Sequence, residues 1–227
     1  DFRNYGPELT VSKVIEKSSN VGTARIAIEI GAERQRDFLG QLGLLETTKF
    51  EMVEARGGRP LLPPRWSELS TMTISYGHGI SATPLHLAAA YATMVNGGTR
   101  VEPTLLKQDG PQFGARVISE KTSEQLRRML RLTVSQGTAS FGEVPGYAVG
   151  GKTGSADKPR IDGRGYETDK VLATFAATFP AHDPKYVLIV TLDEAVETSG
   201  SEPRRTAGWT AVPVAAATSF GEGERRF

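Results

Sequence analysis

The first half of the chain repeats apolar residues at the three- to four-residue spacing of helices, with short polar breaks between the repeats. This spacing predicts helices over residues 10–17, 21–30 and 32–42. Phe38, Leu39 and Leu42 are expected on the inner face of the third helix. The opening section is therefore predicted to be helical.

Breakers and caps divide the middle of the chain. Residues 43–66 hold too many glycines and prolines for a regular element and predict a long loop. Thr83 and Pro84 are typical of a helix start, and the apolar pattern runs from there to Met94. An extended piece is expected over 100–106.

A further helix is predicted after Ser119, which is a suitable N-cap, and it ends at Gly137. The apolar residues of this segment lie at helical spacing. Its arginines, Arg127, Arg128 and Arg131, are expected to form a solvated face.

The last third changes to short apolar runs rich in Val, Thr and aromatic residues, which are typical of strands. Strands are predicted over 147–151, 172–179 and 186–192, and the short 180–185 segment makes the last two antiparallel. An Ala-rich helix over 208–220 follows. Helices, then a sheet, then a closing helix indicate an α+β fold.

Composition excludes several classes of function. The 227 residues include 27 Lys and Arg against 26 Asp and Glu, so the net charge of +1 gives no reason to expect nucleic acid. The absence of cysteine rules out disulfides, thiolate catalysis and cysteine-ligated metals. No run reaches the roughly 18 to 20 apolar residues of a spanning helix. Residues 221–227 are predicted to be a frayed tail.

Lys152, Thr153 and Gly154 follow two glycines at the exit of a predicted strand, an arrangement suited to anion recognition. A carboxylate there would meet the ammonium of Lys152 and the hydroxyls of Thr153 and Ser155. The backbone N–H of Ser155 is suited to an oxyanion. Alone, the triplet is also compatible with a strand end that carries a surface charge.

A second triplet, Ser18-Ser19-Asn20, follows the first predicted helix and by itself reads as a cap and turn. Together, in this order, the two triplets match the Ser-x-Asn and Lys-Thr-Gly motifs of penicillin-binding proteins. The chain resembles the transpeptidase domain of class B penicillin-binding proteins over residues 1–220, and its division-specific type most of all. The supporting stretches are residues 75–98, 150–159 and 206–214.

The resemblance implies a penicillin-binding transpeptidase fold, in which helices flank an antiparallel sheet. It also implies roles: Ser18 would relay protons, and Asn20 would hydrogen-bond the amide of the donor stem peptide. Lys152, Thr153 and Ser155, with Gly154 between them, would hold the terminal carboxylate. Tyr76 and His78 would line the cleft, although a lone histidine in a Tyr-Gly-His-Gly turn is more often a packed residue than a base.

The family's nucleophile, a Ser-x-x-Lys motif, is expected on a helix some tens of residues before Ser18, where only seventeen residues precede it. The one match, Ser155 to Lys158, lies at a strand exit and is rejected. The chain therefore reads as a fragment without nucleophile and without N-terminal strands, inactive on its own. Its sheet would expose an edge that another chain or a swapped copy would cover.

The expected function of the parent protein is peptidoglycan D,D-transpeptidation through an acyl-serine, with D-Ala-D-Ala stem peptides as substrate and β-lactams as covalent mimics. No cofactor or metal is expected. Cell-division proteins are expected partners, and an upstream anchor would place this domain in the periplasm, on the bacterial inner membrane. A D,D-carboxypeptidase or β-lactamase-like hydrolase and a non-catalytic division interaction module stay open as alternatives.

Overall fold

The computed structural model describes residues 1, 3–55, 57–110, 112, 114–160 and 165–220. The chain divides into two compact units, Asp1–Arg127 and Arg128–Phe227, and the division falls inside helix α6 (Glu120–Ser135). The predicted frayed tail, 221–227, lies outside the described residues.

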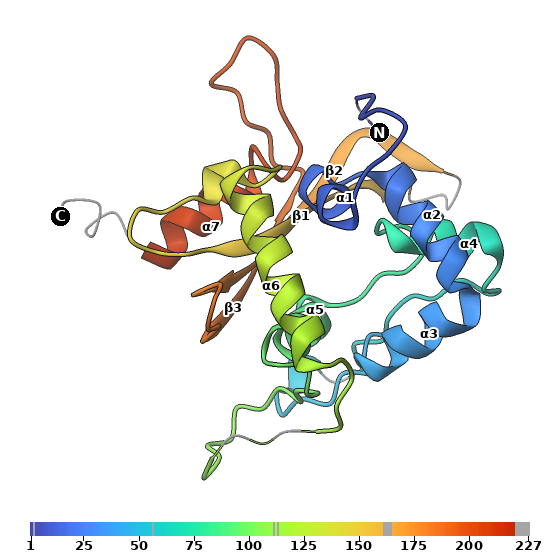
Figure 1. Cartoon of the computed structure of the whole chain (residues 1–227), viewed down its shortest axis with the longest axis vertical. Helices are drawn as coiled ribbons and strands as arrows, with labels where there is room; N and C mark the ends of the chain where they lie inside the picture. Colours follow the sequence, from blue (N-terminus) through green and yellow to red (C-terminus); the bar gives the residue numbers. More distant parts are fainter. Residues whose placement is uncertain (2, 56, 111, 113, 161–164, 221–227) are drawn as a thin grey trace. The chain divides into compact units, whose positions relative to one another are not determined.

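The first unit is helical, as predicted, and its helices α2, α3 and α4 contact one another (Figure 1). Ala27 of α2 and Ile74 of α4 are among its buried apolar residues. The elements of this unit are α1 (Val11–Lys17), α2 (Asn20–Ile30), α3 (Ala32–Gln41), the 3-10 turn η1 (Val53–Ala55), α4 (Glu68–Ser75) and α5 (Pro84–Val95).

Caps begin these helices where the sequence places them. The Thr10 hydroxyl accepts from the N–H of Lys13 at 3.3 Å and starts α1. Thr83 starts α5 in a capping box whose other member is His86. The His86 Nδ1 accepts from the N–H of Thr83, and its Nε2 lies 2.8 Å from the carbonyl of Glu46. Both nitrogens of this buried imidazole are therefore engaged.

In the first unit one helix was not predicted and one expectation is wrong. Helix α4 was not predicted, because its serines and threonines are poor helix formers; in the helix, Thr71 and Ser75 donate to backbone carbonyls of the preceding turn. Phe38 is 37% exposed instead of facing inward. At the start of the 100–106 segment, which was expected to be extended, Thr99 bridges Arg116 in antiparallel fashion, and the N–H of Arg100 donates to the carbonyl of Ala115 at 2.9 Å.

The second unit contains an antiparallel sheet with strand order β1-β2-β3, so the prediction of antiparallel strands is confirmed. The β1–β2 register pairs Gly151 with Ala177 and Lys152 with Ala176. Helix α7 contacts β2 and β3 (Figure 1). The elements here are β1 (Gly150–Pro159), β2 (Tyr166–Phe179), β3 (Tyr186–Asp193), the 3-10 turn η2 (Ser140–Gly142) and α7 (Ala211–Phe220).

The core of this unit lies on one face of the sheet. Ala173, Phe175 and Ala177 alternate along β2, so their side chains share a face. Ala211, Val212 and Ala215 of α7 belong to the same buried cluster. Small alanines on both surfaces allow the helix to lie close to the sheet.

Two expectations for the second half of the chain need correction. The first strand begins at Gly150, not at Tyr147, and the whole Lys-Thr-Gly-Ser segment lies inside it. The arginines of α6 are not simply solvated: Arg127 donates to the carbonyl of Val95, and Arg131 donates to both carboxylate oxygens of Glu143. Guanidinium groups with fixed acceptors organise neighbouring loops, which a solvated face does not do.

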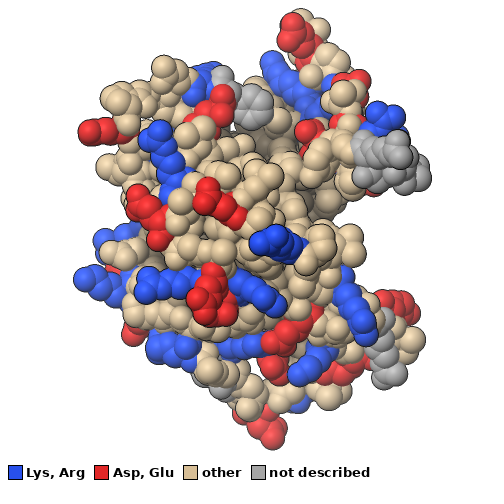
Figure 2. Space-filling model, turned by 90° about the vertical axis from the view of Figure 1, so that its right-hand side faces the viewer, with Lys and Arg blue, Asp and Glu red and all other residues tan. Residues whose placement is uncertain are grey.

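Charge is evenly mixed, as the net charge suggested. On the face drawn in Figure 2, Lys and Arg side chains are interspersed with Asp and Glu across the described residues. On this face, among the described residues, neither sign gathers into one continuous patch.

Gly151 makes room for a core side chain. A Cβ on Gly151 would lie 2.6 Å from two ring carbons of Phe175, which is 1% exposed, and 2.7 Å from the carbonyl oxygen of Ala176. The glycine therefore serves the packing of β1 on β2, where the sequence had suggested close approach to a ligand. A side chain at Gly154 would meet its nearest atom at 3.9 Å.

We expect Gly151→Ala to lower the free energy of unfolding by about 1–3 kcal/mol, because Phe175 must shift. Gly154→Ala, on the same strand, should change it by less than about 0.5 kcal/mol. Urea denaturation followed by far-UV circular dichroism compares the two. Equal stability of both variants would mean that the Phe175 contact does not constrain β1.

Candidate functional site

Ser18 lies at the corner between α1 and α2 in a left-handed conformation, with φ 56° and ψ 49°. Its N–H donates to the carbonyls of Ile15 and Val14 and so ends α1. Left-handed backbone is uncommon for residues other than glycine and is found often at functional sites. The corner thus fixes the backbone of Ser18 and leaves its side chain partly exposed.

The middle residue of the triplet is structural. Ser19 is 1% exposed; its Oγ accepts from the N–H of Gly22 at 3.0 Å and donates to Asp1 Oδ2 at 2.7 Å. It is the N-cap of α2, whose first residue, Asn20, is exposed. Ser19 therefore stabilises the start of α2, and Ser18 and Asn20 are the residues of the triplet that stay accessible.

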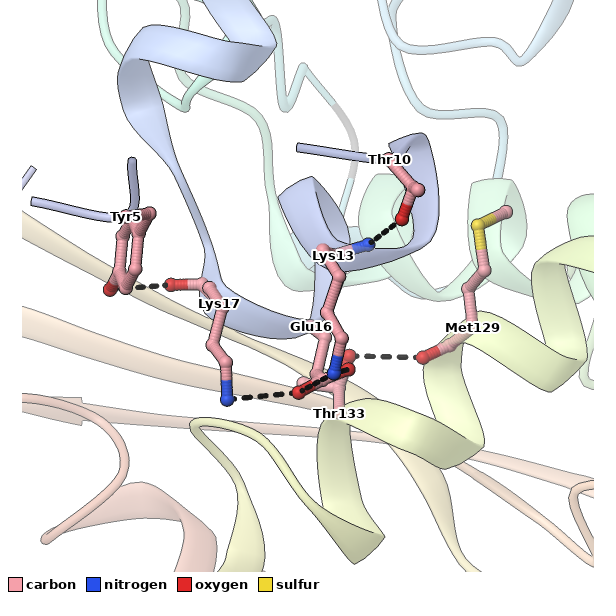
Figure 3. Close-up of polar contacts among 7 residues, drawn as sticks. All are labelled: Tyr5, Thr10, Lys13, Glu16, Lys17, Met129 and Thr133. Carbon is pink, nitrogen blue, oxygen red and sulfur yellow. Dashed lines mark hydrogen bonds and ion pairs between the residues drawn. The ribbon is translucent and has the colours of Figure 1, made fainter. Parts of the chain in front are cut away.

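Helix α1 carries a buried carboxylate two residues before the corner at Ser18 (Figure 3). The side chain of Glu16 is 2% exposed and lies 2.7 Å from Lys13 Nζ and 2.9 Å from Lys17 Nζ. The hydrogen bond from Lys13, followed by that from Lys17, lowers the pKa of Glu16 below its ordinary value of 4.5. The charged form is therefore favoured in the folded state, and the lysines of α1 are oriented by it.

The Tyr76-Gly77-His78 turn ends α4 in a defined geometry. The N–H of Gly77 donates to Ile74 and the N–H of His78 donates to Thr73, the two bonds of a Schellman motif. Gly77 takes φ 100°, which requires glycine. The rings of Tyr76 and His78 lie 5.6 Å apart at 59°. The structure therefore brings together these two predicted cleft residues.

In the second unit, β1 presents its candidate residues on two faces. Residues paired across antiparallel strands share a face, so Thr153 lies on the face of its partner Phe175, and Lys152 lies on the opposite face. Ser155, two residues on, shares the face of Thr153. The ammonium and the two hydroxyls thus flank the strand from opposite sides.

Lys152 is mostly buried, and burial lowers its pKa to about 8. Its Nζ donates to the carbonyl of Thr153 at 3.0 Å. A lysine with this pKa is still largely protonated at neutral pH, and it gives up its proton more readily than an exposed lysine.

Both hydroxyls on the other face are held by neighbouring segments. The Oγ1 atoms of Thr153 and Thr138 lie 2.8 Å apart. The Ser155 Oγ accepts from the N–H of Ala207 at 2.9 Å. Sequence reasoning did not single out Thr138 or assign a role to Ala207, because a Gly-Thr pair after a helix signals only a turn.

The rejection of Ser155 as a nucleophile with Lys158 as its base stays a prediction. Both residues lie on β1 and not on a helix, and the β1–β2 register shifts between Asp157 and Pro159. Lys158 is engaged elsewhere, since its Nζ lies 2.8 Å from Asp193 Oδ1 and 2.9 Å from Glu194 Oε1.

Two further classes of site have no support in the described part of the chain. His, Asp and Glu side chains there form no group of three that is suited to a metal ion. No helix among those residues is both long enough and apolar enough to cross a bilayer.

The Glu16 network predicts a pH-dependent stability. Because the pKa of Glu16 is lowered by folding, the stabilisation is present above pH 4.5 and is lost as pH falls through the lower folded value. We expect Glu16→Gln to reduce the free energy of unfolding by about 1–2 kcal/mol at pH 7. The difference from the unmodified chain should shrink below pH 4.5, measured by urea denaturation across pH.

The exposed Glu29 of α2 offers a matched control. Glu29→Gln should change stability by less than about 0.5 kcal/mol and show no such pH dependence. A Glu16→Gln effect that is the same at pH 7 and at acid pH would contradict the charged network.

Comparison with known proteins places the chain in one family. Residues 1–210 match the family model described as the penicillin binding protein transpeptidase domain. The chain is 36% identical over 225 residues to the probable peptidoglycan D,D-transpeptidase FtsI of Caulobacter vibrioides, covering 95% of this chain and 38% of that protein. It is 32% identical to Escherichia coli FtsI, a peptidoglycan D,D-transpeptidase, covering 86% of this chain and 33% of that protein.

Solved structures agree. The transpeptidase domain of penicillin-binding protein 3 from Burkholderia pseudomallei superposes with a TM-score of 0.82 at 35% identity, covering 96% of this chain and 63% of that one. Penicillin-binding protein 3 from Mycobacterium tuberculosis, complexed with ampicillin, gives 0.81 at 30% identity, covering 94% and 51%. The chain spans about a third of the length of the curated relatives it matches.

Proposed function

Since the chain belongs to the penicillin-binding protein transpeptidase family, we propose that it forms the donor-peptide-binding part of a peptidoglycan D,D-transpeptidase that acts in cell division. The single observation that carries this proposal is the composition of β1. One strand combines an ammonium of lowered pKa with two hydroxyls whose positions are fixed by the fold.

The edge position of β1 suits peptide binding. In the described part of the chain, β1 pairs with one strand, β2, so its other side offers backbone N–H and C=O groups to an extended ligand. A stem peptide ending in D-Ala-D-Ala would lie along it. Its terminal carboxylate would accept hydrogen bonds from Thr153 and Ser155, and the positive charge of Lys152 would favour the anion.

The proposed reaction proceeds through an acyl-serine. A serine oxygen would attack the carbonyl of the penultimate D-Ala, and the peptide C–N bond would break to release D-Ala as the free amine. The amine of a neighbouring stem peptide would then displace the serine. Ser18 would carry the proton toward the leaving amine, and Asn20 would hydrogen-bond the donor amide.

The remaining candidates have supporting roles in this proposal. Tyr76 and His78 would line the cleft, with their positions set by the Schellman turn. The nucleophile would lie outside these 227 residues, since Ser155 lies on a strand and Lys158 is paired with Asp193. A membrane anchor and a periplasmic location belong to the same proposal for the whole protein.

Labelling with a fluorescent penicillin, read by intact mass, tests the acyl-serine proposal. We expect no adduct on this chain and one adduct on a version extended at its N-terminus through a Ser-x-x-Lys helix. An adduct on Ser155 would overturn the placement of the nucleophile outside these 227 residues. No adduct on the extended version would favour a non-catalytic division module, and rapid hydrolysis of the adduct would favour a carboxypeptidase or β-lactamase-like enzyme.

Lys152 predicts the pH dependence of carboxylate binding. Its pKa of about 8 means that the positive charge is present below pH 8 and is lost as pH rises through that value. Affinity for a peptide ending in D-Ala-D-Ala should therefore fall about threefold to tenfold between pH 7 and pH 9, measured by NMR titration. Lys152→Gln should bind more weakly at pH 7 and show no such fall. A fall that persists in that variant would assign the titration to another group.

A further inference from the structure

Hydroxyl groups have one proton to donate, and the contacts of β1 determine where that proton can go. The Ser155 Oγ accepts from the N–H of Ala207 at 2.9 Å, and a backbone N–H can only donate. The proton of Ser155 therefore stays available for an acceptor other than Ala207. An anion beside β1 is the acceptor that this arrangement suits.

Thr153 has the same kind of contact. Its Oγ1 lies 2.8 Å from the Oγ1 of Thr138, and either hydroxyl is able to donate in that pair. When Thr153 donates to a bound carboxylate, its lone pair is left to accept, so Thr138 must be the donor. Donation by Thr138 would also polarise the Thr153 hydroxyl and strengthen its bond to the anion.

The backbone that carries Thr138 is well fixed. It follows α6, where the N–H groups of Gly137 and Ala139 both donate to the carbonyl of Thr133 at 3.1 Å. Ala139 is fully buried in the core cluster. Thr138 is therefore held at a constant position beside β1, as a positioning group requires.

The segment that carries Ala207 is fixed against the same turn. A Cβ on Gly208 would lie 2.7 Å from the carbonyl oxygen of Thr138, so the two backbones touch where a side chain would not fit. One residue on, the Trp209 ring packs against Phe141 in a tilted arrangement, with the ring centroids 4.9 Å apart and the planes at 49°. The Cζ of Arg204 lies 3.8 Å from the centroid of the Trp209 ring. The turn that carries Thr138 and the segment that carries Ala207 together hold the hydroxyls of Thr153 and Ser155.

We propose that Thr138 is a positioning residue for carboxylate recognition: its hydroxyl donates to Thr153, as the N–H of Ala207 does to Ser155, so that both β1 hydroxyls direct their protons at the same anion. This proposal rests on the proposed function of β1. Thr138 acts through Thr153 and does not touch the ligand.

The test compares Thr138→Val, which keeps the shape and removes the hydroxyl, with Thr138→Ser, which keeps the hydroxyl. The chain is titrated by NMR with N-acetyl-D-Ala-D-Ala and with the same peptide carrying a C-terminal amide. We expect the valine variant to bind the acid about 3- to 10-fold more weakly, and the serine variant to bind within about twofold of the unmodified chain. Affinity for the amide should not change.

A second readout needs no ligand. The side-chain coupling constants of Thr153 should report one rotamer in the unmodified chain and in the serine variant, and rotamer averaging in the valine variant. Unchanged amide shifts in β3 would show that the valine variant is folded.

The outcomes separate the two proposals. Equal acid affinity in the valine variant and the unmodified chain would overturn the role of Thr138 and leave the function of β1 standing. An unmodified chain that does not prefer the acid to the amide would overturn the proposed function, and the ligand role of Thr138 with it.

Discussion

The contact between Gly151 and the ring of Phe175 sets the position of β1 on β2, and the second unit depends on it. The same register pairs Lys152 with Ala176 and Thr153 with Phe175, which sends the ammonium and the hydroxyls to opposite faces. A slip of one residue would exchange those faces and would also drive a side chain into Phe175. The packing of Gly151 on Phe175 and the orientation of the Lys152 and Thr153 side chains therefore depend on the same strand register.

Polar groups in this protein are organised in two ways. In the first unit, backbone geometry places them: a left-handed Ser18 between two helices, and a Schellman turn before His78. In the second unit, neighbouring segments place them through their own hydrogen-bonding groups, Thr138 and the N–H of Ala207. A hydroxyl proton rotates freely about the C–O bond, so a fixed hydrogen-bonding partner in the protein is needed to orient it.

Much of the local structure followed from the sequence. Thr10 and Thr83 begin helices at the predicted positions because a cap is satisfied within three residues of itself. The strands over 172–179 and 186–192 formed with the expected hairpin. Helix α4 was missed because its serines and threonines weaken the helix signal, and the contact of Gln35 with the Thr71 carbonyl comes from α3, thirty-six residues away.

The sequence by itself determined the two triplets, their order, the α+β class and the family resemblance, since all of these are properties of residue identity and short-range spacing. Only the tertiary structure decided that Gly151 makes room for Phe175, that Lys158 pairs with Asp193, and that Thr138 reaches Thr153. Each of these depends on strand register or on segments brought together from distant positions. Local preferences carry no information about such contacts, because long-range packing selects among conformations that are locally equivalent.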